Sequence, residues 1–208
     1  MRRAGAVFFF LIAAALPAAA EGLPGVPPKP GGYVAGYISA GVGASLPAGG
    51  HWGDASTGFK PSPALSLAVS RRVDALFSYG LDSFNAWHYE NRPAGGLDLK
   101  IASLTPFVQV SAPEGALTYY AILGLGFYRW SHASFRSGSI VYGADSAWTG
   151  GFNLGAGLLF PFAGNSRAGF ELRWHQVLNL RGASFHLGAA NSLNLMMVVR
   201  GDLRSEQP

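Results

Sequence analysis

Apolar residues alternate with small or polar residues through most of the chain after Tyr33. From Trp148 to Phe160 the even positions are mainly apolar, whereas the odd positions are mainly Gly, Thr or Asn. The stretch from Ala168 to Leu178 repeats this pattern. Successive side chains of a β-strand point to opposite faces, so the alternation predicts strands that have one apolar and one polar face.

The alternating runs are long for strands. Strands of soluble proteins average about five or six residues, whereas a strand that crosses a membrane needs about 9–11 residues. Most of these runs reach or exceed the membrane-spanning length. We count eight runs, at 33–46, 63–72, 76–89, 97–111, 117–130, 147–160, 167–179 and 185–200.

The connections between the runs alternate in length. Short turns are expected at 72–75, near 113–115 and at 163–166. Long loops are expected at 47–62 and 131–146, and shorter connections on the same side are expected at 90–96 and 180–184. Short turns at one end and longer loops at the other are typical of outer-membrane barrels. We therefore predict an all-β fold, an eight-stranded antiparallel up-and-down transmembrane β-barrel.

One run breaks the alternation. In 97–111 the apolar residues first occupy odd positions, as at Leu97 and Leu99, and then even positions, as at Leu104 and Val108. A β-bulge near Ala102 and Ser103 would shift the phase in this way, so we expect one there.

The composition supports a surface that faces something other than water. Charged residues make up 12% of the chain, about half of the usual quarter. Hydrophobic residues make up 49%, so the chain is not expected to be disordered. The chain has no Cys, which excludes disulfides and thiol catalysis, and it has no clustered basic stretch of the kind that binds nucleic acid.

The first residues have the pattern of an export signal. Arg2 and Arg3 precede a short apolar run, and Ala18 to Ala20 form a small-residue cleavage site. An uncleaved membrane anchor is the alternative interpretation. The predicted organisation is a signal peptide at 1–20, a Pro-rich periplasmic leader at 21–32, a β-barrel at 33–203 and a polar tail at 204–208.

Charged residues fall on the faces opposite the apolar ones and are expected to point into the barrel. Buried charges need partners, so we expect the acidic and basic members of this set to form ion pairs. A gated ion path and a catalytic acid–base pair are alternatives, but we favour a salt-bridged plug. The predicted lumen network is Asp82, Lys100, Glu171, Arg173 and His175, with Arg72 and His186 as further candidates.

Aromatic residues cluster near the ends of the predicted strands. Two aromatic girdles at the membrane interfaces would account for them, and a sugar-binding role for the tryptophans is the alternative. The predicted loop-side girdle is Trp87, Tyr89, Trp130 and Trp148, and the predicted turn-side girdle is Phe77, Phe107, Phe160 and Phe162.

Catalytic motifs are weak. His132 and Ser134 lie two residues apart and would share a strand face, and Asp145 is the acid nearest in sequence. Outer-membrane lipid A deacylases carry a His-x-Ser pair on an eight-stranded barrel, but the residues around His132 lack the rest of that pattern. We therefore expect no catalytic residues, no bound metal and no cofactor.

The glycine and aromatic pattern resembles a known family. The segments 104–107, 119–128 and 151–157 are similar to those of small outer-membrane β-barrels, which include OmpA-like, OmpX-like and OmpW-like proteins. The resemblance implies export to the outer membrane of a Gram-negative bacterium. It also implies contact with outer-membrane lipid, lipopolysaccharide and the assembly machinery. We expect a monomer. Unlike most members, the last predicted strand does not end in Phe or Trp.

Four functions are compatible with these patterns. The preferred one is a non-enzymatic barrel with a filled polar lumen, which contributes envelope structure and presents surface loops. The alternatives are a narrow OmpW-like channel for small or hydrophobic solutes, a lipid A-modifying enzyme, and a secreted lipocalin-like binding protein. The lipocalin-like alternative needs the large apolar residues inside the barrel, and the sequence favours a polar interior.

Overall fold

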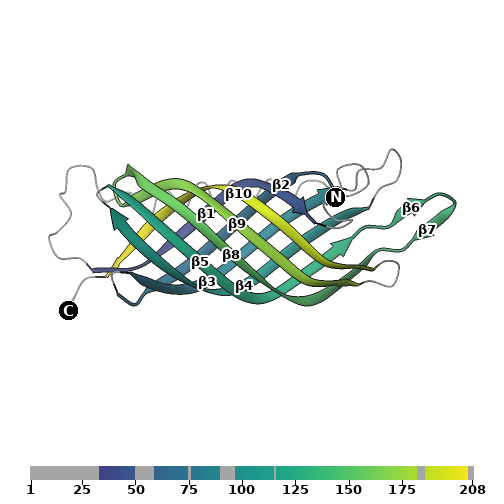
Figure 1. Ribbon diagram of the computed structural model, residues 1–208, viewed down its shortest axis with the longest axis horizontal. Helices are drawn as coiled ribbons and strands as arrows, with labels where there is room; N and C mark the ends of the chain where they lie inside the picture. Colours follow the sequence, from purple (N-terminus) through teal and green to yellow (C-terminus); the bar gives the residue numbers. More distant parts are fainter. Residues whose placement is uncertain are drawn as a thin grey trace.

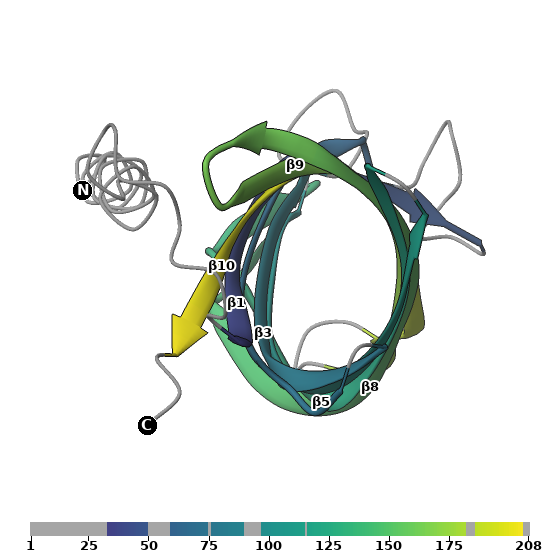
Figure 2. The ribbon, with the colours of Figure 1, turned by 90° about the vertical axis from the view of Figure 1, so that its left-hand side faces the viewer.

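The computed structural model describes residues 33–49, 59–74, 76–89, 97–114, 116–181 and 186–205. In this part of the chain eight antiparallel strands form a closed barrel (Figures 1 and 2). The barrel strands are β1 (Tyr33–Ala48), β2 (Ser62–Arg72), β3 (Phe77–Tyr89), β4 (Asp98–Glu114), β5 (Leu117–His132), β8 (Asp145–Ala163), β9 (Ser166–Arg181) and β10 (His186–Ser205). The predicted fold class and all eight predicted runs are confirmed.

Strands that follow one another along the chain are neighbours around the barrel, and β10 pairs with β1 to close it. One connection contains further strands, since β6 (Phe135–Ser137) and β7 (Ile140–Tyr142) form a hairpin between β5 and β8. This hairpin was not predicted. It projects beyond one end of the barrel (Figure 1).

The two ends of the barrel differ. At the end we call the turn end, short connections at 73–76, 115–116 and 164–165 join the strands, and β1 begins and β10 ends there. At the loop end the strands are joined by longer connections at 49–61, 90–97 and 133–144 and by a short one at 182–185. The predicted layout, with short turns at one end and the long loops at the other, is therefore confirmed, as is the shorter connection expected between the last two strands.

Asp74 organises the turn between β2 and β3. Its carboxylate accepts hydrogen bonds of 2.7 Å from the backbone amides of both Leu76 and Phe77. These two hydrogen bonds, which favour the ionised form, lower the pKa of the Asp74 carboxyl from its usual value.

The predicted bulge in β4 is wrong. The pairing of β4 with β3 runs without a shift from Tyr89–Asp98 to Phe77–Val110. Odd-numbered residues of β4 face inward throughout, so Leu99 and Ile101 lie inside the barrel rather than on its outer wall. The change of apolar face reflects an apolar interior at the loop end, which a continuous strand can line without any change of phase.

The outer wall of the barrel is apolar over most of its height. Along each strand the outward positions carry large apolar side chains that are exposed, and the inward positions are mostly buried. Representative exposed residues from the eight barrel strands are Val42, Leu67, Leu81, Val108, Leu125, Leu154, Phe170, Leu172, Leu195 and Met197.

Small residues on the inner wall make room for rings. Gly157 lies directly across from Tyr120 on the neighbouring strand. A Cβ at Gly157 would overlap the Tyr120 ring and its hydroxyl oxygen. The glycines on the polar faces of the strands therefore provide space for large side chains that cross the interior.

Several predicted segments lie outside the described residues, namely the signal peptide at 1–20, the leader at 21–32 and the last three residues of the predicted tail. Strand β10 continues to Ser205, two residues past the predicted end of the barrel. No helix in the described segments is long and apolar enough to cross a membrane.

Candidate functional site: a cross-braced lumen

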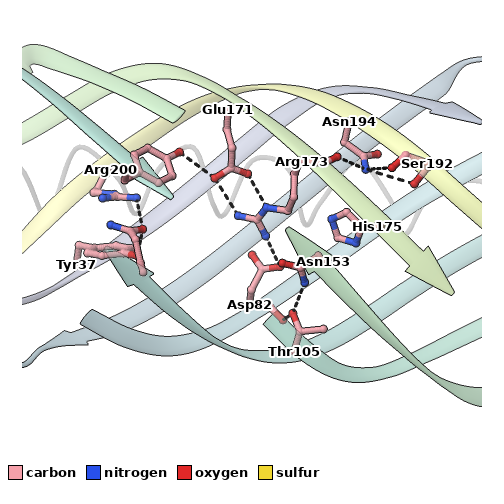
Figure 3. Close-up of polar contacts among 12 residues, drawn as sticks. Tyr37, Asp82, Thr105, Asn153, Glu171, Arg173, His175, Ser192, Asn194 and Arg200 are labelled. Carbon is pink, nitrogen blue, oxygen red and sulfur yellow. Dashed lines mark hydrogen bonds and ion pairs between the residues drawn. The ribbon is translucent and has the colours of Figure 1, made fainter. Parts of the chain in front are cut away.

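Arg173 lies at the centre of a buried ion cluster (Figure 3). Its Nη1 donates to Asp82 Oδ2 at 2.8 Å, its Nη2 donates to Glu171 Oε2 at 2.9 Å, and its Nε lies 2.7 Å from Glu171 Oε1. All three side chains are at most 5% exposed. Glu171 and Arg173 come from β9, whereas Asp82 comes from β3, four strands away around the barrel. The contact with Asp82 therefore spans the lumen from one wall to the opposite wall.

Arg200 forms a second bridge across the lumen, nearer the turn end. Its guanidinium carbon lies 3.7 Å from the centre of the Tyr37 ring and 4.7 Å from the centre of the Tyr120 ring. Its Nη2 donates to Gln109 Oε1 at 3.1 Å, and this oxygen also accepts the Tyr37 hydroxyl at 2.6 Å. Arg200 is on β10 and Gln109 is on β4, which are again opposite strands of the barrel.

Tyr120 joins the two bridges. Its hydroxyl donates to Glu171 Oε2 at 2.8 Å, while its ring lies under Arg200. Two arginines and two carboxylates thus share one connected network, so the buried charges balance without any ion from solvent. Removal of one charge from such a network is costly, because it leaves its partner buried and unpaired.

Neutral polar side chains extend the network towards the loop end. The amide nitrogen of Asn153 donates to the Thr105 hydroxyl at 3.2 Å, and that of Asn194 donates to the Arg173 carbonyl at 3.0 Å. His175 stacks on Phe84 with ring centroids 4.1 Å apart, and its Nδ1 lies 3.1 Å from the Tyr128 hydroxyl. Figure 3 shows His175 and Asn194 on the other side of the Arg173 cluster from Arg200.

The loop end of the lumen is apolar. The buried side chains that pack together there come from the four strands β4, β5, β9 and β10 and from the segments just before β2 and β4. They are Phe59, Leu97, Leu99, Ile101, Tyr128, Trp130, Val177, Leu180 and Ala190.

A small space of about 20 Å³ remains at the turn end. Arg72 and Arg200 are among the residues that line it, as are Arg167 and Asp202, whose charged groups lie 3.9 Å apart. This volume is close to that of a single water molecule, so the space has no room for a larger solute.

The structure brings together three of the five residues predicted for the lumen network, namely Asp82, Glu171 and Arg173. His175 is fully inside but contacts rings rather than the ion cluster. The prediction for Lys100 is wrong, because Lys100 is exposed on the outer wall, between inward-facing Leu99 and Ile101. Arg72 is half-buried at the turn end, and the side chain of His186 lies outside the described set.

Two of the predicted girdle residues are misplaced. Trp130 and Phe107 are 1% and 4% exposed. Both are buried inside the barrel, where they pack against other residues of the inner wall. The other six lie on the outer wall: Trp87, Tyr89 and Trp148 towards the loop end, and Phe77, Phe160 and Phe162 towards the turn end.

His132 and Ser134 do not form the pair that a nucleophile would need. β5 ends at His132, whose side chain points inward and whose Nδ1 lies 2.8 Å from the Ala133 carbonyl oxygen. Ser134 is exposed and lies past the end of the strand. Within the described residues no group of three or more His, Asp or Glu side chains is arranged to hold a metal ion.

Four residues of the lumen network were not predicted from the sequence, namely Tyr37, Gln109, Tyr120 and Arg200. Tyr120 and Gln109 do follow the period of two on inward faces, so the signal was present. Arg200 shares its inward face with Met196 and Val198, so that face of β10 reads as apolar and gave no sign of a polar bridge.

No family model and no curated protein matches the chain. Among solved structures, it is similar to neisserial surface protein A, with a TM-score of 0.62 and 13% identity over 83% of this chain and 99% of that one. OprG from Pseudomonas aeruginosa has a TM-score of 0.49 and 13% identity over 84% of this chain and 99% of its own. Ail of Yersinia pestis has a TM-score of 0.46 and 17% identity over 79% and 98%. The first of these similarities, together with the closed barrel, shows the fold of the small eight-stranded outer-membrane barrels.

Proposed function

We propose that this protein spans the outer membrane as a non-conducting barrel that contributes envelope structure and presents its loops outside. The apolar outer wall supports the membrane location. A soluble monomer rarely exposes a continuous apolar surface larger than a few hundred Å², whereas a lipid-facing wall needs one around the whole barrel. The shared fold with neisserial surface protein A supports the same location.

The observation that carries the non-conducting role is the pair of contacts between opposite walls. Arg173 reaches Asp82 and Arg200 reaches Gln109, at 2.8 Å and 3.1 Å, across a barrel of eight strands. A barrel of this size is just wide enough for side chains to fill its interior. Direct contacts across the full width at two levels support a lumen that is closed to water and ions.

The membrane location is tested by fractionation and by gel mobility. We expect the protein in the outer-membrane fraction, and we expect the unboiled protein to migrate differently from the boiled protein, because a folded barrel resists dodecyl sulfate. Recovery in the soluble periplasmic fraction would contradict the location.

The closed lumen is tested by conductance in planar bilayers. We expect no steady conductance from the unmutated barrel, and small, fluctuating currents from a variant that lacks both bridges, Arg173→Ala with Arg200→Ala. A matched control with Arg71→Ala, which removes an exposed cation from the outer wall, should stay silent. A large and steady conductance of the unmutated protein would contradict a filled lumen.

A second candidate function is entry of apolar solutes from the loop end. The buried apolar cluster around Leu99 and Trp130 favours it, because an apolar mouth can accept an apolar molecule that a polar lumen would repel. The test is uptake of an apolar dye by vesicles with and without the protein. Equal uptake by the two kinds of vesicle would favour the non-conducting barrel. Faster uptake with the protein, slowed by Leu99→Gln, would support the conduit.

A lipid A-modifying activity is the least supported function, because His132 and Ser134 do not meet. Mass spectrometry of lipid A from cells that express the protein should show no new species. A new species that disappears in Ser134→Ala would overturn the non-enzymatic proposal.

A further inference from the structure

A hollow on the outer wall lies near the loop end of β3, β4 and β5. Its volume is about 240 Å³, and the residues that line it include Asn85, Trp87, Lys100, Ala102, Arg129 and Ser131. The hollow is outside the lumen, since these six residues take the outward positions of their strands.

The strand pairing explains the hollow. Lys100 pairs with Trp87 on one side and with Ser131 on the other, and Ala102 pairs in the same way with Asn85 and Arg129. The short side chain of Ala102 therefore lies at the centre, among longer side chains. Lys100 and Arg129 are diagonal neighbours on adjacent strands, a geometry that places their Cα atoms about 7–8 Å apart.

The lining is cationic. Lys100 and Arg129 are both exposed, and none of the described residues that line the hollow carries a carboxylate. Neither cation has an ion pair or a side-chain hydrogen bond within the described residues. Asp98 lies two residues before Lys100 on the same face but does not line the hollow. Ser131 and Asn85 add neutral groups that can donate hydrogen bonds to an anion.

The surroundings of the hollow resemble a membrane interface. Trp148 pairs with Arg129 and is 64% exposed, so tryptophans lie on both sides of the two cations. Tryptophans of membrane proteins gather at the level of the lipid headgroups. Leu104 and Phe127 are the next outward-facing pair towards the turn end. Both are exposed, and they form an apolar wall on which an acyl chain could lie.

We propose that this hollow binds the phosphate of a phosphorylated lipid headgroup, with Lys100 and Arg129 as its cationic ligands and the lipid chain against Leu104 and Phe127. Arginine and lysine are the side chains that proteins use to bind phosphate. The inference rests on the membrane location proposed above. It assigns a role to two cations that the lumen network does not use.

The test uses the purified, folded full-length barrel in detergent micelles. Native mass spectrometry measures how much diphosphorylated lipid A it retains, compared with lipid A of the same acyl chains from which both phosphates have been removed. We expect the phosphorylated lipid to be retained about tenfold more strongly, in line with the strength of charge-assisted hydrogen bonds. Salt at high concentration should weaken this preference.

Variants separate the hollow from general charge. Lys100→Gln with Arg129→Gln should remove the preference for the phosphorylated lipid, whereas Arg71→Gln, an exposed cation of the outer wall outside the hollow, should keep it. Each variant is first checked for folding by its gel mobility before boiling. A preference that survives in the double variant, or that Arg71→Gln also abolishes, would overturn the proposal.

A further arm distinguishes the source of the phosphate. Inorganic phosphate at the concentration of the lipid should fail to displace it, because it lacks the chain that contacts Leu104 and Phe127. Displacement would overturn the lipid assignment in favour of a free anion. The membrane location is measured separately by fractionation, so a barrel in the outer membrane without lipid preference would refute this inference alone.

Discussion

Replacement of Arg173 by Met is the most direct test of the lumen network. The methionine keeps an unbranched chain of similar reach but removes the charge and all three contacts of 2.7–2.9 Å with Asp82 and Glu171. Two carboxylates that are at most 4% exposed then remain without the cation that contacts both of them. Removal of one partner from a buried ion pair costs about 3–5 kcal/mol, and we expect a loss of this size in the free energy of unfolding.

The measurement is urea unfolding of the barrel in lipid vesicles, followed by gel mobility and by tryptophan fluorescence. The informative control is the triple variant Asp82→Asn, Glu171→Gln, Arg173→Met. It keeps the volumes but removes all three charges of the Arg173 cluster, so no unpaired carboxylate remains there. Arg200 keeps its contacts with the Tyr37 and Tyr120 rings and with Gln109. Replacement of a buried ion cluster by neutral groups is often close to neutral, and we expect the triple variant to lose less than about 1 kcal/mol.

Two results would refute the reasoning. If Arg173→Met loses less than about 1 kcal/mol, the carboxylates do not depend on Arg173 for compensation. If the triple variant loses as much as the single variant, packing of the arginine rather than its charge stabilises the barrel.

Three further predictions address the wall, the interior and a turn, all measured as changes in the free energy of unfolding in urea. Leu154→Arg places a cation on the apolar outer wall and should cost about 2–4 kcal/mol, whereas the same change at outward-facing Ser146 near the loop end should cost about 0–1 kcal/mol; equal costs would contradict the position of the apolar band. Gly157→Ala should cost about 1–3 kcal/mol, because its Cβ would overlap the tyrosine ring on the neighbouring strand. Gly143→Ala, which meets nothing within 4 Å, should be neutral, and a matching loss there would refute the steric explanation. The lowered pKa of the Asp74 carboxyl means that it stabilises the fold above its unfolded pKa and that this contribution disappears as the pH falls through the folded value; the difference between wild type and Asp74→Ala should therefore shrink in acid, and a constant difference would contradict the prediction.

The fold was predictable because one physical rule, the alternation of faces along a strand, repeats in all eight strands. The rule gives each strand two faces but does not say which of them lies inside. The apolar residues on either side of Lys100 suggested an outer face, so Lys100 was predicted to point inward. Leu99 and Ile101 in fact pack inside the apolar loop end of the lumen. Local alternation therefore fails where the lumen changes from polar to apolar along its length.

The partners within the lumen were not predictable in the same way. Asp82 and Arg173 are 91 residues apart and meet because β3 and β9 are opposite strands of an eight-membered ring. That opposition depends on strand order, and the height at which the two side chains meet depends on register around half of the barrel. The register depends on the turns and on the packing between strands, so the sequence of a single strand does not determine it.

The closure between β1 and β10 has a consequence for how the molecule folds. This seam pairs Tyr33 with Ser205 and Ala48 with Asn191, so it joins the two ends of the barrel segment. It cannot form until the last strand has been synthesised, and it needs the largest loop closure in the chain, which makes folding slow. Until that moment β1 and β10 each present an unpaired edge, and such edges template aggregation. The two edges therefore need protection before the barrel closes. This kinetic requirement on the sequence of the seam cannot be seen in the closed barrel.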